Sequence, residues 1–157
     1  MAFNAINHAM TGMATGGFST LDNSIAGYNS SLMEILHYIP MILGALSLPF
    51  YFKLFYQRKF NALWRDNQSA ALFSGIVLGS LGLAFFLSYS PGVLTPFRDS
   101  FFQYISALTT TGWQNTGVNN WSNEAIVFFV CGAMVIGGSA GSTTAGIKLV
   151  RALLIAR

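Results

Sequence analysis

The chain has 157 residues, of which 53% are hydrophobic and only 8% charged, and its mean hydropathy is +0.52. An ordinary soluble domain carries about 25% charged residues, so this composition excludes that class and favours a membrane protein. The net charge of +3 says less than the placement of the charges, because seven of the eight Lys and Arg residues lie at the ends of apolar runs.

The chain opens on a short amphipathic stretch that leads into a glycine-containing loop, formed by Thr15, Gly16, Gly17 and Phe18. This stretch has no basic leader, so it does not fit a signal peptide. We expect a short helix already under way at Met1, in a chain that is a piece of a longer protein. In that helix, His8 and Asn7 are expected to hydrogen-bond to a neighbouring helix.

Residues 31–56 form the first predicted membrane span, and three residues in it predict bends: Pro40, Gly44 and Pro49. Its charged groups lie near the ends, where long side chains can reach the membrane surface. Glu34 and His37 have helical i and i+3 spacing, and we expect them to pair with each other rather than to bind a metal.

Residues 57–68 form a basic linker, and residues 69–89 are an uncharged stretch about 30 Å long as a helix, which is enough to span a bilayer. The positive-inside rule places the linker, with Arg58, Lys59 and Arg65, in the cytoplasm. The spans then alternate so that both glycine-containing loops lie outside and Lys148 lies inside. The protein is therefore expected to be a multi-pass protein of the cell membrane.

A second short helix is predicted from Pro96 to about Thr109, because Thr95 is a favourable N-cap, proline suits the first helical turn and Asp99 complements the helix dipole. At roughly 20 Å this helix cannot cross the bilayer. We expect it to enter from outside and to end near the membrane centre, where its free carbonyl groups attract cations.

The second short helix leads into a loop that repeats the first one 95 positions later: Thr110, Thr111, Gly112 and Trp113. The same offset pairs Thr11 with Ser106 and Lys53 with Lys148, which indicates a duplicated helix–loop–helix unit. One copy alone would be interpreted as a tight turn. Two copies in matching positions favour a selectivity filter.

A filter of this kind replaces the water shell of a cation with backbone carbonyl groups, and glycine lets a carbonyl turn inward without a clashing side chain. We therefore predict that a cation is coordinated by the carbonyl groups of Gly17 and Gly112. The aromatic residues Phe18 and Trp113 are expected to pack behind the loops and hold them open. Neither loop contains an acidic residue.

The third predicted span, residues 125–147, contains a glycine-rich segment that disfavours a continuous helix. Unwound backbone at membrane depth must be buried in protein or line a wet cavity, so we predict a gate below the filter. Lys148 would either repel cations or anchor it. Its predicted residues are Gly137, Gly138, Ser139, Ala140, Gly141, Ser142, Thr143, Thr144, Ala145, Gly146 and Lys148.

Three other interpretations of this segment remain open to comparison. Gly137 and Gly141 have the small-xxx-small spacing at which two intact helices can pack closely. Residues 137–141 match the GxSxG nucleophile elbow, which requires a preceding strand and would make Ser139 a nucleophile. Residues 141–148 partly match a phosphate-binding loop, but the spacing departs from GxxxxGK[ST].

The strings GGFST at 16–20, TTTG at 109–112 and above all GGSAGSTTAGIK at 137–148 resemble the Trk/Ktr/HKT superfamily of potassium transporters, most closely its Trk potassium uptake branch. The resemblance implies an all-α membrane fold with four helix, pore-loop and helix repeats in one polypeptide. Residues 1–57 would be the later part of repeat two, 58–68 a cytoplasmic linker, and 69–157 repeat three. The resemblance also implies a cytoplasmic nucleotide-binding regulatory partner.

These observations predict potassium uptake, with potassium as substrate and no covalent cofactor, and no enzymatic activity. Two loops cannot surround an ion alone, so repeats one and four must complete the pore, and a homodimer is expected. The alternative is a non-conducting structural or assembly subunit, which would tolerate alanine at Gly17 and Gly112. An intramembrane enzyme would instead depend on Ser139.

Overall fold

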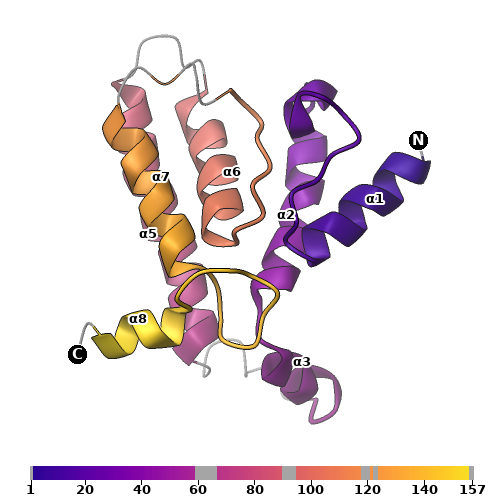
Figure 1. Cartoon of the computed structure of the whole chain (residues 1–157), viewed down its shortest axis with the longest axis vertical. Coiled ribbons are helices and arrows are strands. Elements are labelled where there is room, and N and C mark those ends of the chain that lie inside the picture. Colours follow the sequence, from indigo (N-terminus) through magenta and orange to yellow (C-terminus); the bar gives the residue numbers. More distant parts are fainter. Residues whose placement is uncertain (1, 59–66, 90–94, 118–120, 122–123, 156–157) are drawn as a thin grey trace.

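The computed structural model describes the whole chain except residues 1, 59–66, 90–94, 118–120, 122–123 and 156–157. The described residues form helices and loops with no strand (Figure 1). The elements in chain order are α1 (Ala2–Met13), the 3₁₀ helix η1 (Ser24–Tyr28), α2 (Ser31–Ala45), α3 (Leu48–Phe55), α5 (Asn67–Ser88), α6 (Pro96–Leu108), α7 (Glu124–Ile136) and α8 (Leu149–Ile155).

Helix α5 is the one described helix that is by itself long and apolar enough to cross a membrane, and the bent pair α2 and α3 would count as a second. One side of α5 packs mainly on α6, and its residues Leu72, Leu83 and Leu87 are all fully buried. The opposite side exposes apolar side chains such as Leu78 and Phe85, as expected for contact with lipid. The basic linker lies largely outside the described residues.

Helices α2 and α3 meet at a sharp bend of 100°. The bend follows from the sequence at 46–49, because Leu46 and Ser47 are extended and the hydroxyl of Ser47 caps α3 by accepting the amide of Phe50 at 3.3 Å. Pro49 lies in the first turn of α3, where its missing N–H costs nothing. Pro40, in contrast, lies inside α2 without ending it.

Helix α6 matches the predicted short helix within a residue, and Asp99 lies in its first turn. Thr95 occupies the N-cap position, but its hydroxyl makes no capping bond to the backbone. It donates instead to the Asp99 carboxylate at 3.1 Å. The Thr95 hydroxyl therefore does not accept a backbone N–H of the first turn, although the amide of Asp99 donates to the carbonyl of Thr95 at 3.0 Å.

The third predicted span is broken, as the glycine content indicates. Helix α7 ends at Ile136, the chain is non-helical through Lys148, and the short helix α8 follows. Figure 1 shows the non-helical segment running below α6 and reaching the lower end of α2.

Candidate functional site

The two glycine-containing loops share one backbone conformation. We call residues 15–18 the first loop and residues 110–113 the second loop. Thr15 and Thr110 have positive φ angles of 50° and 53°, and Gly17 and Gly112 have φ angles of 70° and 87°. A positive φ is strained for threonine and free for glycine, so the same unusual path is imposed twice.

The helix ends that lead into the loops are also equivalent. In the first, the amide of Gly16 donates to the carbonyl of Thr11 at 2.8 Å. In the second, the amide of Thr111 donates to the carbonyl of Ser106 at 2.9 Å. Each pair is related by the 95-residue offset, so the sequence repeat is present in the backbone hydrogen bonds as well.

The two loops lie against each other. A Cβ atom placed on Gly17 would sit 1.9 Å from the carbonyl oxygen of Thr111, which no side chain can tolerate. A Cβ atom on Gly112 would meet nothing within 4 Å. Gly17 is thus required for the close approach of the two strands, whereas Gly112 is required by its φ angle and faces open space.

The aromatic residues that follow the glycines behave differently. Trp113 is fully buried, as predicted, in space that the lack of a side chain at Gly12 leaves open, since a Cβ there would lie 2.7 Å from the indole. Phe18 is 76% exposed in this chain, so its packing behind the first loop stays a prediction. No described element covers its ring.

The glycine-rich segment, residues 137–146, is bonded to the inner ends of both loops. The hydroxyl of Thr143 lies 2.9 Å from the carbonyl oxygen of Met13, at the end of α1, and 2.9 Å from that of Gly44 in α2. The amide of Ala145 donates to the hydroxyl of Thr110 at 2.8 Å. The segment therefore lies directly beneath both loops.

The segment is also tied to the bend between α2 and α3. The amide of Ser139 donates to the carbonyl of Ala45 at 3.2 Å, and the amide of Leu48 donates to the carbonyl of Gly141 at 3.1 Å. The ammonium group of Lys148 donates to the carbonyl of Thr144. Of the two roles predicted for Lys148, this contact matches the anchor.

Two alternative interpretations of the segment are wrong. Gly137 and Gly141 both have positive φ angles and lie outside any helix, so they do not form a helix-packing face. The elbow needs a strand before its serine, but helix α7 precedes Ser139, whose buried hydroxyl has no hydrogen-bond partner. Ser139 therefore lacks both the strained turn and the base that would activate it.

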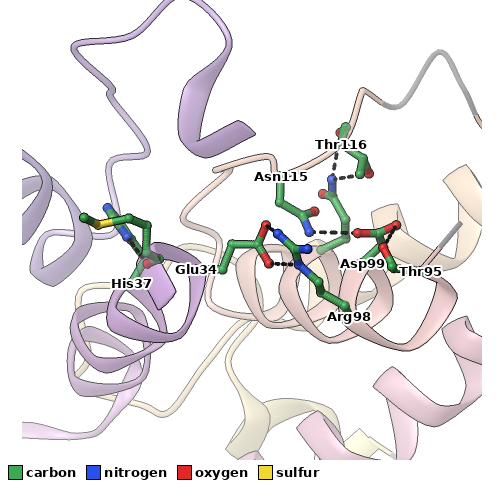
Figure 2. A network of polar contacts seen from close by, with 9 residues as sticks. Glu34, His37, Thr95, Arg98, Asp99, Asn115 and Thr116 are labelled. Atoms are coloured by element: carbon green, nitrogen blue, oxygen red, sulfur yellow. Dashed lines mark hydrogen bonds and ion pairs between the residues drawn. The ribbon is translucent and has the colours of Figure 1, made fainter. Parts of the chain in front are cut away.

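An ion pair links the two repeats on the side of the loops away from the glycine-rich segment. The guanidinium of Arg98 in α6 makes two hydrogen bonds of 2.7 Å to the carboxylate of Glu34 in α2 (Figure 2). The predicted pairing of Glu34 with His37 is wrong, because His37 donates to the carbonyl of Met33 in its own helix at 2.6 Å. Arg98 is the one Lys or Arg residue that does not lie at the end of an apolar run, and its pairing with Glu34 was not predicted.

Asp99 organises the chain beyond the second loop. Its carboxylate accepts from the side-chain amide of Asn115 at 3.0 Å, and Gln103 donates to the carbonyl of Thr116 at 2.9 Å (Figure 2). Burial raises the pKa of the Asp99 carboxyl, and hydrogen bonds from Thr95 and Asn115 oppose this change. These contacts fix the exit from the second loop and were not predicted.

Two expectations concerned the polar residues of α1. His8 bonds to the hydroxyl of Ser19 at 3.0 Å and to that of Tyr28, in η1, at 3.3 Å. Asn7 donates to the carbonyl of Phe3 in its own helix, so it does not reach a neighbouring one. Among the described residues, no group of three or more His, Cys, Asp or Glu side chains could hold a metal ion.

Fold and repeated loops define an all-α membrane protein with helix, re-entrant loop and helix units. A solved structure shares this arrangement: the crystal structure of the potassium transporter TrkH from Vibrio parahaemolyticus matches with a TM-score of 0.92 and 28% identity, over 99% of this chain and 34% of that one. The family model for TrkH, described as cation transport protein, matches residues 1–85 and 86–157. The chain belongs to the TrkH family of cation transport proteins.

Curated relatives agree with this assignment. The Trk system potassium uptake protein TrkH of Escherichia coli K12 is 34% identical over 158 aligned residues, covering 98% of this chain and 32% of that protein. An uncharacterized cation transporter of Methanocaldococcus jannaschii is 32% identical over 153 residues, covering 98% of this chain and 30% of that protein. The chain thus spans about a third of the length of these relatives.

Proposed function

We propose that this chain forms part of a potassium uptake protein, in which both loops line one selectivity filter. The filter residues are Thr15, Gly16, Gly17 and Phe18 in the first loop and Thr110, Thr111, Gly112 and Trp113 in the second. The observation that carries the proposal is the shared backbone path of two loops in contact, with glycine at the point where they approach most closely.

Carbonyl chemistry explains how such loops select a cation. Peptide oxygens replace the water shell of the ion, and the oxygens of Gly17 and Gly112 serve as ligands. Neither loop carries a carboxylate that would favour divalent ions. Helices α1 and α6 end at the loops, and the partial negative charge of their C-terminal ends favours a cation there.

Residues 137–146, with Lys148, act as the gate. The segment blocks the inner side because its bonds from Thr143 and Ala145 hold it against the inner end of both loops. Opening requires these bonds to break together with those to the bend between α2 and α3. Glycines at 137, 141 and 146, all at positive φ, give the segment the conformations it needs.

The rest of the pore lies elsewhere in the full-length protein. In our proposal residues 1–57 belong to repeat two, residues 58–68 are a cytoplasmic linker and residues 69–157 are repeat three. Repeats one and four complete the ring of carbonyl groups, and the protein is a multi-pass homodimer in the cell membrane. A cytoplasmic nucleotide-binding subunit regulates it.

The test is ion selectivity of the full-length protein after Gly112→Ser. Serine at a φ of 87° is strained, and the side chain enters the open space beside the loop, so the preference for potassium over sodium should fall about tenfold or more. Gly132→Ser is the matched control, because that glycine also has no neighbour within 4 Å but lies in the regular helix α7.

The measurement compares potassium and sodium fluxes in proteoliposomes at equal protein content. Unchanged selectivity of Gly112→Ser would contradict the filter. Full uptake by both Gly17→Ala and Gly112→Ala would instead support a non-conducting structural or assembly subunit.

A further inference from the structure

We propose that the hydroxyl groups of Thr11 and Ser106 are positioning residues that set the outer limit of the filter. They do so by turning the carbonyl of the aromatic residue in each loop back toward the protein. The row of ion-facing oxygens then ends at Gly17 and Gly112. This inference rests on the proposed function, and it assigns a role to residues in the short helices rather than in the loops.

The same tie is present in both repeats. The hydroxyl of Thr11 donates to the carbonyl of Phe18 at 3.0 Å, which is nearer than the carbonyl of His8 in its own helix at 3.3 Å. The hydroxyl of Ser106 donates to the carbonyl of Trp113 at 2.8 Å. Both pairs span seven residues and are related by the 95-residue offset. An aliphatic residue at either position could not make this bond, which explains why both repeats carry a hydroxyl residue there.

A hydrogen-bonded carbonyl is a poor ligand for a passing ion. The donor engages one of its two lone pairs and fixes its direction, and turning the oxygen toward the pore would leave the donor unpaired. At Ser106 this cost is high because the side chain is buried, with 1% of its surface exposed. The peptide group after each filter glycine is therefore fixed with its oxygen away from the ion.

In the first loop a second donor strengthens the tie. The indole N–H of Trp113, from the second loop, donates to the carbonyl of Phe18 at 3.2 Å. Phe18 therefore accepts two hydrogen bonds, one within its own repeat and one across repeats. The side chain of Phe18 has no N–H group, so it cannot make the equivalent bond to the carbonyl of Trp113.

The indole is held rigidly enough to act as a fixed donor. It packs edge-on against the rings of His37 and His8, with centroid distances of 4.9 Å and 5.8 Å. The segments that follow the loops are joined as well, since the amide of Ala26 in η1 donates to the carbonyl of Gln114 at 3.0 Å. The position of the first loop is thus set partly by the second.

The number of hydrogen-bond donors on each aromatic carbonyl predicts how strongly each variant should change ion selectivity. Ser106→Ala removes the only donor that the described residues offer to the Trp113 carbonyl, so it should lower the preference for potassium over sodium about threefold to tenfold. Thr11→Val alone leaves the indole donor on Phe18 and should change selectivity less than twofold. Trp113→Phe removes the indole donor and also alters a residue of the second loop, so the tie is measured by the further loss that Thr11→Val causes beside it. Together they should lower it as much as Ser106→Ala, which is more than the two single effects combined.

The experiment measures potassium and sodium fluxes of the full-length protein for these variants. Thr11→Ser keeps the hydroxyl and should match the unmodified protein. Combined with Trp113→Phe, it should be more selective than Thr11→Val combined with Trp113→Phe. Ser74→Ala is the control for hydroxyl removal, because Ser74 bonds only within α5. A purely structural role would lower protein abundance without changing the flux ratio.

Gly112→Ser is measured in parallel to separate two kinds of failure. If Gly112→Ser loses selectivity while Ser106→Ala and the Thr11→Val, Trp113→Phe pair retain it, the filter stands and this inference is overturned. If Gly112→Ser also retains selectivity, the proposed function itself fails. Should Ser106→Ala not accumulate in the membrane, the Thr11 and Trp113 pair decides, since each of those single changes leaves a donor in place.

Discussion

The two repeats build the same loop in different surroundings. Around the second loop, α5 covers α6, and nine residues of α6 are buried. Around the first loop, α1 has only His8 and Gly12 buried and exposes Phe3, Ile6 and Met10. The loop backbone is nonetheless the same, so it is set by the helix end and the glycine and not by the elements that cover the helix.

The packing of other elements on α1 and on α6 differs on the side of α1 that faces α2. A hollow of about 560 Å³ lies there, lined mainly by apolar side chains with His8 and His37 among them. The counterpart face of α6 is filled by α5, where a Cβ on Gly79 would sit 1.9 Å from Tyr104. Covering elements therefore determine side-chain burial, as in the contrast between Trp113 and Phe18, and leave the loop path unchanged.

Helices α2 and α7, which follow the first and second loops, also differ in the length of the break that ends them. Helix α2 breaks for two residues at Leu46 and Ser47, whereas α7 gives way to twelve non-helical residues before α8. The two breaks are hydrogen-bonded to each other through Ser139 and Leu48. One repeat thus supplies a fixed bend and the other a segment that rests on it.

The largest expected effect tests the close approach of the loops. Gly17→Ala places a methyl group 1.9 Å from the Thr111 oxygen, in addition to the strain of a φ of 70°, so selective potassium uptake should be lost. Gly132→Ala is the matched control, because that glycine lies in α7 and a Cβ there would meet nothing within 4 Å. Uptake assays in cells that lack other potassium transporters measure both. Equal uptake by the two variants would contradict the contact between the loops.

A smaller effect is expected at the gate. Thr143→Val leaves the carbonyl groups of Met13 and Gly44 without the hydroxyl donor, which should weaken the closed segment by about 1 kcal/mol and raise the resting potassium flux several-fold. Ser74→Ala is again the control for hydroxyl removal. Flux through the closed protein is measured in liposomes, and an unaltered or reduced resting flux would argue against a latch at Thr143.

The smallest effect on transport is expected at the link between α2 and α6. Glu34→Gln removes a carboxylate that is 6% exposed and leaves Arg98, 36% exposed, without its partner. The free energy of unfolding should fall by about 1–3 kcal/mol, at the lower end for buried pairs because Arg98 reaches solvent. Glu124→Gln, at an exposed glutamate in the first turn of α7, should change it little.

Thermal denaturation in detergent compares these two variants. Replacing both partners, Glu34→Gln with Arg98→Met, should recover part of the loss, because no charge is then left unpaired. Equal stability of Glu34→Gln and the unmodified protein would show that the pair does not hold the repeats together.

The sequence predicts those features that depend on neighbours along the chain. Pro96 and the N-cap position fix the start of α6, and the glycines after Ile136 end α7, so both boundaries were predictable. The pairing of Glu34 with Arg98 joins residues 64 positions apart and competes with the nearby His37, so local spacing gave the wrong partner. The exposure of Phe18 depends on which elements cover the loop, and no local pattern contains that information.

The contact between the repeated loops could be predicted only in outline. The 95-residue offset indicated that the loops are equivalent, but not that Gly17 approaches Thr111 or that Trp113 reaches Phe18. The pairing of Thr11 with Ser106 was visible in the sequence, yet its meaning depended on seeing both hydroxyl groups bonded to the aromatic carbonyl groups.

The most direct test of the central claim is the location of a heavy potassium analogue in the full-length protein. Crystals grown with rubidium or thallium(I) should show an anomalous peak between the loops, in contact with the carbonyl oxygens of Gly17 and Gly112 and not with those of Phe18 and Trp113. A pore whose bound ions all lie away from Gly17 and Gly112 would contradict the account.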